Sequence, residues 1–171
     1  MIGISTTKKK RIRGCKMKVG LILNDMSANQ LSYFAISHIN EKIKTDNSSD
    51  FVLFFENATP SVVTPMFACM NSSEIWNFDG VLLSTTVSNT LTSIKAVTPK
   101  KKYFYVWDLE WNRANGKDFE SSIGAYIDPE ISLIARGHDH AKAIENYCNK
   151  KVCGIVPNFN IKQLMDIISH E

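Results

Sequence analysis

The stretch KVGLILNDMSANQLSYFAISHINEKIK, residues 18–44, decides the fold. Residues 18–23 form a continuous apolar run, which is typical of a parallel strand buried on both faces. The polar residues 24–29 then predict a turn, in which Ser27 or Asn29 is suited to cap a helix. Helical spacing follows at residues 31, 34, 35, 38, 39 and 43. The stretch therefore predicts a strand, a turn and a helix.

The same order of elements is expected along the rest of the chain. Further strands are predicted at 50–55, 79–86, 102–107, 131–137 and 151–156, and further helices at 88–97, 139–150 and 160–170. Residues 71–78 suggest one or two helical turns, and residues 112–126 are the least regular stretch. Strands that alternate with helices indicate an α/β fold with a single doubly wound, mostly parallel Rossmann-like sheet of about six strands and helices on both faces.

Length and composition set the class of protein. The 171 residues fit one domain, placed at 17–171 after a basic tail at 1–16. A hydrophobic fraction of 44% and a charged fraction of 22% are ordinary for a soluble protein. The apolar runs are too short to span a membrane. The sequence shows no secretory signal, and its four cysteines form no C-x-x-C pair, so we expect reduced thiols and a cytoplasmic location.

The basic tail has three interpretations. The formal net charge of the whole chain is +3. Residues 1–16 contain six basic and no acidic side chains, so the remaining residues carry a net negative charge and are mildly acidic. A solvated tail is the favoured interpretation, and weak contact with nucleic-acid phosphates is the functional one. A third hypothesis is a start-site artefact, since Met17 opens a segment that resembles a natural protein start; native protein beginning at Met1 would refute it. The residues of the nucleic-acid hypothesis are Lys8, Lys9, Lys10, Arg11 and Arg13.

Polar residues follow the predicted strands where a parallel sheet binds its ligands. The first turn lacks the G-x-G-x-x-G pattern, and the chain has no Walker-type phosphate loop, which argues against a dinucleotide or nucleoside triphosphate site. The candidate ligand-binding residues are Asp25, Ser27, Thr85, Asp108, Glu110 and Asn158.

The pair Asp108 and Glu110 resembles the D-x-D/E motif with which sugar-nucleotide transferases hold a divalent ion. Residues i and i+2 of an extended chain point the same way, which suits shared coordination. The favoured alternative is a solvated strand end with Trp107 and Trp111 packed beneath it. No metal ligand and no catalytic residue is therefore assigned.

The C-terminal third carries a family resemblance. Residues 131–164, ISLIARGHDHAKAIENYCNKKVCGIVPNFNIKQL, resemble the end of the N-terminal domain of GT-B glycosyltransferases, in which a short strand ends in a "vipNgvD" turn. Asn158 matches the asparagine of that turn, whereas Phe159 and Asn160 depart from the glycine and acidic positions. The segment KVGLILND also fits the first strand of the family. The body from 18 to 164 is similar to glycosyltransferase-like proteins of T4-like marine phages.

The resemblance implies the acceptor-side half of a GT-B fold. In the family the C-terminal domain supplies most of the nucleotide-sugar site, and this chain stops at Glu171, where that domain would begin. We therefore expect a second glycosyltransferase subunit as partner, with a nucleotide sugar and a divalent cation as cofactors, in the host cytoplasm if phage-encoded. Whether this chain is itself an enzyme stays open. The alternative is a non-catalytic phage interaction or virion-associated module whose basic tail contacts nucleic acid.

Overall fold

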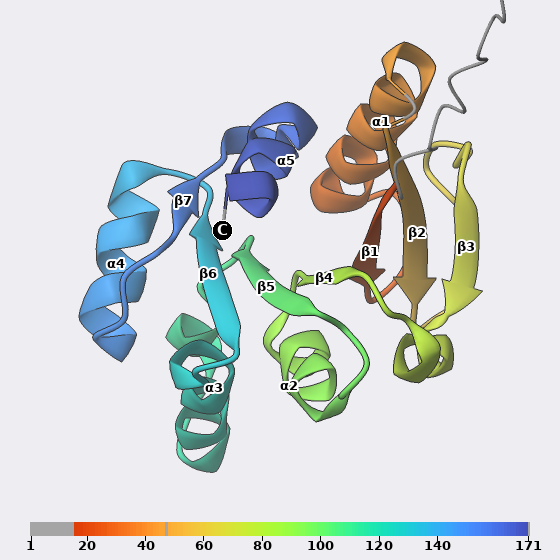
Figure 1. Ribbon diagram of the computed structural model, residues 1–171. Coiled ribbons are helices and arrows are strands. Elements are labelled where there is room, and N and C mark those ends of the chain that lie inside the picture. Colours follow the sequence, from red (N-terminus) through yellow and green to blue (C-terminus); the bar gives the residue numbers. More distant parts are fainter. Residues whose placement is uncertain (1–15, 47, 171) are drawn as a thin grey trace, which may run out of the picture.

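Seven parallel strands form one sheet in the order β3-β2-β1-β4-β5-β6-β7 (Figure 1). The computed structural model describes residues 16–46 and 48–170. The strands are Met17–Leu23 (β1), Ser49–Phe55 (β2), Ala68–Asn71 (β3), Val81–Ser84 (β4), Lys101–Val106 (β5), Ile131–Ala135 (β6) and Gly154–Ile155 (β7). The α-helices are Gln30–Thr45 (α1), Val87–Lys95 (α2), Lys117–Ile127 (α3), His138–Cys148 (α4) and Ile161–His170 (α5). Short 3-10 helices lie at Ser72–Asn77 (η1), Glu110–Arg113 (η2) and Pro157–Phe159 (η3).

The central strand β1 explains the apolar run that opens the fold. It pairs with β2 along its whole length, from Met17 opposite Ser49 to Leu23 opposite Phe55. On its other side it pairs with β4, where Val19 lies opposite Val81. Residues 19–23 are buried, as expected for a strand with neighbours on both sides and helices over both faces.

The strand order reverses between β1 and β4. After β1 the chain builds β2 and β3 on one side and then returns to add β4 and its successors on the other side. Neighbouring crossovers therefore leave the sheet in opposite directions at this point. In open parallel sheets such a switch point, at the carboxyl ends of the strands, is where ligands bind.

Helices cover both faces of the sheet, as β5 shows most clearly. Tyr103 and Tyr105 enter the core shared with α1 and α5, whereas Phe104 and Val106 enter the core shared with α2, α3 and α4. Figure 1 shows the same division, with α1 and α5 on one side of the sheet and α2 and α3 on the other. The predicted doubly wound, parallel α/β architecture is confirmed.

Three details of the prediction are wrong. The sheet has seven strands rather than about six, because residues 68–71 add the edge strand β3 beside β2. The stretch 112–126 is not irregular, because most of it forms η2 and α3. The last strand is shorter than the predicted 151–156 and spans only Gly154–Ile155. The presence and length of each strand depend on its pairing with a neighbouring strand as well as on the local sequence pattern.

The predicted tail lies largely outside the described part of the chain. Residues 1–15 are not described, and these include the basic positions 8–11 and 13 of the nucleic-acid hypothesis and the segment before the hypothetical start at Met17. Lys16 is the first described residue and directly precedes β1. Within residues 16–46 and 48–170, none of the helices has the length and apolar character needed to cross a membrane.

Candidate functional site

A cleft opens at the switch point, beside the carboxyl ends of β1 and β4. Its volume is about 280 Å³. Most of the side chains around it carry amide, hydroxyl or carboxylate groups, and one large aromatic ring joins them. The residues that matter for recognition are Asn24, Asp25, Asn29, Gln30, Thr86 and Trp107. The fold thus places a polar cleft where the strand order predicts a ligand site.

The turn after β1 is held by its own side chains. Asp25 accepts a hydrogen bond from the backbone nitrogen of Ser27 at 2.9 Å and another from the Ser27 hydroxyl. Asn29, the second of the two cap candidates, caps α1 by accepting from the backbone nitrogen of Ser32 at 2.8 Å. The Ser32 hydroxyl donates a hydrogen bond to the backbone carbonyl of Asp25 at 3.0 Å. A carboxylate and an amide therefore occupy the positive end of α1, where a phosphate would otherwise bind.

Across the switch point, Asn24 ties β1 to α2. Its Oδ1 accepts from the Asn89 amide at 2.8 Å and from the Thr86 hydroxyl at 3.2 Å. The Thr85 side chain is almost fully buried and donates to the carbonyl of Ile22 at 2.8 Å. Thr85 lines the cleft, but its hydroxyl already donates its proton to this carbonyl of β1. Its role there is to hold β4 against β1.

Asp108 and Glu110 do not form an extended pair. The strand β5 ends at Val106, and Leu109, which precedes η2, has φ −85° and ψ 73°, so the chain is not extended from Asp108 to Glu110. Glu110 accepts from the backbone nitrogen of Val87 at 2.8 Å, and Asp108 accepts from the Arg113 guanidinium at 2.5 Å. The extended geometry on which the hypothesis of shared coordination depends is therefore absent from this stretch. No cluster of three or more metal-binding side chains occurs within the described ranges.

The environment of Glu110 changes its acidity. Burial raises the pKa of this carboxyl above its ordinary value, the hydrogen bond from Val87 opposes that rise, and the nearby Asp108 carboxylate adds to it. Burial also raises the pKa of the neighbouring Tyr126 phenol, and the Glu110 charge is the second cause. Glu110 is thus a proton-binding group at the N-terminus of α2. Its measured contact is a helix cap.

Asn158 lies in a tight turn rather than in the lining of the cleft. Asn158 and Phe159 both have positive φ angles, of 49° and 53°, and the backbone nitrogen of Asn160 donates to the carbonyl of Pro157 at 3.1 Å. These are the features of a type I′ turn. The Phe159 ring is buried against Tyr105, with ring centroids 5.1 Å apart. The turn therefore anchors the segment between β7 and α5.

Sequence reasoning missed the recognition value of Trp107. Trp107 packs against the hydrophobic core, as the interpretation of a packed strand end predicted, and it also lines the cleft. The Arg136 guanidinium carbon lies 5.0 Å from the ring centroid, and its Nη1 donates to the Trp107 carbonyl at 3.1 Å. Phe34 lies on another side, at 6.4 Å between centroids. The available signal was position, because Trp107 is the first residue after β5, in which residues 102–106 are buried.

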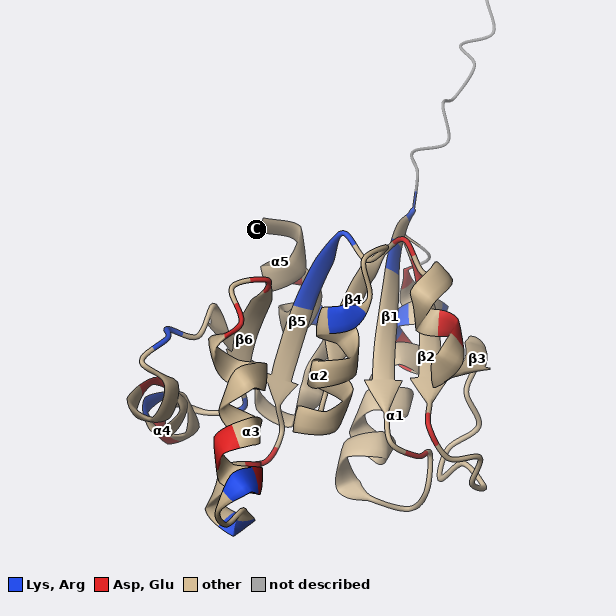
Figure 2. Ribbon diagram, turned by 90° about the horizontal axis from the view of Figure 1, so that it is seen from below, with Lys and Arg blue, Asp and Glu red and all other residues tan. Residues whose placement is uncertain are grey.

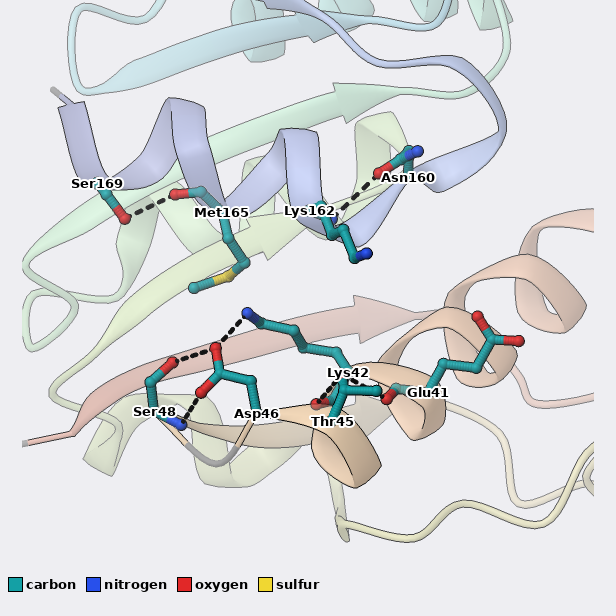
Figure 3. A network of polar contacts seen from close by, with 9 residues as sticks. All are labelled: Glu41, Lys42, Thr45, Asp46, Ser48, Asn160, Lys162, Met165 and Ser169. Atoms are coloured by element: carbon teal, nitrogen blue, oxygen red, sulfur yellow. Dashed lines mark hydrogen bonds and ion pairs between the residues drawn. The ribbon is translucent and has the colours of Figure 1, made fainter.

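A second cavity, of about 270 Å³, lies between α1 and α5. The His38 ring contacts the carbonyl of Phe159 at 3.0 Å through Nδ1. Figure 3 shows that the polar contacts around this cavity close helix ends, since Lys42 pairs with Asp46 at 2.5 Å and Asn160 accepts from the backbone nitrogen of Lys162 at 3.1 Å. The Lys42 hydrogen bond is also the main cause that lowers the pKa of Asp46. These contacts have a structural explanation and leave the switch-point cleft as the candidate site.

The comparison of the chain with family models, with curated proteins and with solved structures found no match. The α/β architecture therefore rests on the structure itself. The function must be inferred from the cleft and its side chains.

Proposed function

We propose that the switch-point cleft binds a carbohydrate, and that the chain acts as the acceptor-side, GT-B-like component of a glycosyl-transfer system. The observation that carries the proposal is the composition of the cleft, which is lined by the amides of Asn24, Asn29 and Gln30, the carboxylate of Asp25 and the Trp107 side chain. Amides both donate and accept hydrogen bonds and a carboxylate accepts them, as sugar hydroxyls require. An aromatic wall gives the apolar face of a sugar ring a surface to pack on.

The charges around the cleft favour a neutral ligand over a diphosphate. Neither lysine nor arginine is among the described side chains that line it. Asp25 closes the turn before α1, and Glu110 closes the N-terminus of α2. A diphosphate in the cleft would meet the Asp25 carboxylate, and side chains already accept from a backbone nitrogen in the first turn of α1 and of α2. This arrangement supports a sugar acceptor and disfavours a nucleotide in the same cleft.

Some polar groups of the cleft remain available for a ligand. Within the described residues, the Gln30 side chain makes no hydrogen bond, and Asn24 uses only its oxygen in the contacts with Asn89 and Thr86. Because Gln30 is exposed at the start of α1, it can reorient toward a ligand without loss of an internal contact. These two residues are the natural positions for sugar recognition.

The turn after β7 has a backbone geometry that agrees with the GT-B-like proposal. The family turn has asparagine followed by glycine, and this dipeptide suits the two positive φ angles of a type I′ turn. The chain keeps such a turn at Asn158, with Phe159 in the glycine position at φ 53°. Phe159 is tolerated there because its ring fills a buried site against Tyr105. The proposal assigns the nucleotide sugar and its divalent cation to a second glycosyltransferase subunit.

Ligand titration tests the proposal through the indole signal of Trp107. Neutral oligosaccharides are expected to shift the signal in NMR spectra, with assignment by the Trp107→Phe variant. Nucleotide sugars alone, with or without Mn²⁺, are expected to shift it far less. Gln30→Ala should weaken the sugar response, whereas Gln163→Ala, an exposed glutamine on α5, should leave it unchanged. Tight nucleotide-sugar binding, or no sugar response at all, would contradict the acceptor-side assignment.

A further inference from the structure

The amino edge of the sheet, opposite the cleft, is rich in lysine. Figure 2 shows the basic residues at the starts of β1 and β5, at the end of the molecule where the strands begin. Five lysines lie at this edge and are called the edge lysines below. They are Lys16, Lys18, Lys100, Lys101 and Lys102.

Carboxylates neutralise three of the edge lysines but not the other two. Lys16 pairs with Asp50 at 3.3 Å, and Lys18 pairs with Asp79 at 2.7 Å. Lys102 pairs with Glu130 at 2.6 Å. Lys100 and Lys101 are both exposed and form no ion pair within residues 16–46 and 48–170. The edge therefore carries uncompensated positive charge at the start of β5.

The edge lysines surround two adjoining cavities. One has a volume of about 700 Å³, and its charged lining residues are Lys100, Lys101, Lys102 and Glu130. The other has a volume of about 270 Å³, and its charged lining residues are Lys16, Lys18, Lys100 and Asp79. Lys100 belongs to both, so the two hollows form one basic track across the starts of β1, β4 and β5. Neighbouring strands are about 4.8 Å apart, and the track therefore extends about 10 Å along the edge.

One lysine is fixed within this track. The Lys102 side chain is only 6% exposed, and its ammonium donates to the carbonyl of Ile94 at 3.1 Å and to Glu130. Burying an ammonium is costly unless it is paired, and these contacts satisfy most of its donors. The wall of the larger cavity thus holds a charged group in a defined place, with Lys100 and Lys101 free to adapt beside it.

Trp76, an exposed aromatic residue of η1, is hydrogen-bonded through its backbone to the segment that precedes β5. Trp76 is 45% exposed, and its backbone carbonyl accepts a hydrogen bond from the hydroxyl of Thr98, two residues before Lys100. Proteins that bind single strands without sequence preference combine a basic groove with aromatic rings on which bases stack.

We propose that the edge lysines bind the phosphate backbone of single-stranded nucleic acid, with Trp76 as a stacking surface. Several charges along an open edge match a polymer of phosphates better than one small anion. The interaction is independent of base sequence, since lysine contacts to phosphates carry no sequence information. The surface lies at the opposite edge from the carbohydrate cleft and does not depend on its function.

Fluorescence anisotropy with the full-length chain tests the proposal. The probes are labelled 20-nucleotide strands of thymidylate and of mixed sequence, each titrated at several salt concentrations. Binding should weaken with salt and be similar for both probes. The Lys100→Glu/Lys101→Glu variant should bind about tenfold more weakly or worse, with a salt slope reduced by about one per lysine. Trp76→Ala should weaken binding several-fold with an unchanged salt slope.

Two further variants make the result specific to the edge. Lys117→Glu/Lys142→Glu causes the same change in net charge on exposed residues of α3 and α4, and it should leave binding within about twofold. Lys8→Gln/Lys9→Gln/Lys10→Gln separates the tail from the folded edge. Equal losses in the edge and control variants would overturn the proposal, as would a loss confined to the tail variant. Thermal unfolding of each variant excludes loss of fold as the cause.

Discussion

The carboxylate of Glu110 accepts a hydrogen bond from the backbone nitrogen of Val87 across 2.8 Å. This contact joins the loop after β5 to the first residue of the helix that precedes β5 in the chain. It places a negative charge on the positive end of α2, beside the switch point. The carboxylate is half-buried, so its contribution to stability depends on pH.

Two substitutions of Glu110 should distinguish the stabilising effect of its hydrogen bond to α2 from the effect of its charge. Glu110→Ala removes the acceptor and should lower the free energy of unfolding by about 1 kcal/mol. Glu110→Gln keeps an acceptor oxygen and should be more stable than Glu110→Ala at neutral pH. Urea unfolding of the three proteins at pH 7 measures both differences. Equal losses in the two variants would show that the charge, and not the hydrogen bond, stabilises α2.

The raised pKa of Glu110 predicts the sign of a pH effect. Because the folded protein binds this proton more tightly than the unfolded chain, the associated stability is complete below the ordinary value of 4.5 and is lost as the pH rises through the folded-state pKa. The free energy of unfolding of the wild type, relative to Glu110→Gln, should therefore fall as the pH rises from about 4.5. Urea unfolding across that range checks the sign, and a pH-independent difference would contradict the assignment.

Gly80 lies where a side chain cannot fit. A Cβ atom there would collide with the backbone carbonyl of Lys18 and the ring of Phe78. Gly80→Ala should therefore lower the free energy of unfolding by about 2 kcal/mol, because a backbone atom cannot move aside. Gly124→Ala is the control, since the nearest atom to its Cβ, on Leu91, is 3.7 Å away. Alanine within α3 should raise stability by about 0.5–1 kcal/mol, and chemical denaturation compares the two.

Replacing Phe159 in the type I′ turn by glycine has two opposing effects on the free energy of unfolding. Glycine would relieve backbone strain of about 1–2 kcal/mol. Loss of the buried ring should cost about 3–5 kcal/mol, so Phe159→Gly is expected to be destabilising by about 2–3 kcal/mol overall. Asn158→Gly, at the exposed neighbouring position, should change stability by less than about 0.5 kcal/mol. A Phe159→Gly variant as stable as the wild type in urea would mean that strain equals the packing gain.

Asp108 should not govern a response to Mn²⁺ in this chain alone. Its carboxylate is engaged by Arg113, and Glu110 is engaged by Val87. Mn²⁺ should therefore change the midpoint of thermal unfolding equally in the wild type, in Asp108→Asn and in the exposed control Asp118→Asn. A rise that only Asp108→Asn abolishes would revive the paired-carboxylate metal site.

The buried parallel strands could be predicted because each carries its own apolar run. The edge strand β3 could not, since its four residues are mostly exposed and only pairing with β2 makes them a strand. The helix α3 was obscured by Gly116, Gly124 and its serines, which lower helix propensity. Its signal was nevertheless present, because Phe119, Ile123 and Tyr126 recur at helical spacing.

The candidate site was predictable in place but not in detail. Asp25 follows β1, as expected from strand order, and lines the cleft. The different hydrogen-bond partners of Asp108 and Glu110 depend on where η2 begins, which local sequence does not reveal. Asn158 was singled out by resemblance, and the structure places it in a turn that lies outside the lining of the cleft. The hydrogen-bond partner of a polar side chain depends on how the whole molecule packs, not on the local sequence alone.

The parallel pairing of every strand also constrains the order of events during synthesis. β1 finds its first neighbour only when residues 49–55 have emerged, and its second only after Val81. No two adjacent strands can join through a short hairpin, because parallel neighbours require a crossover. The central strand β1 therefore waits longest for neighbours on both sides. Until β4 has been synthesised, β1 has an unpaired edge in the nascent chain, and such an edge is a site for chaperone binding or aggregation.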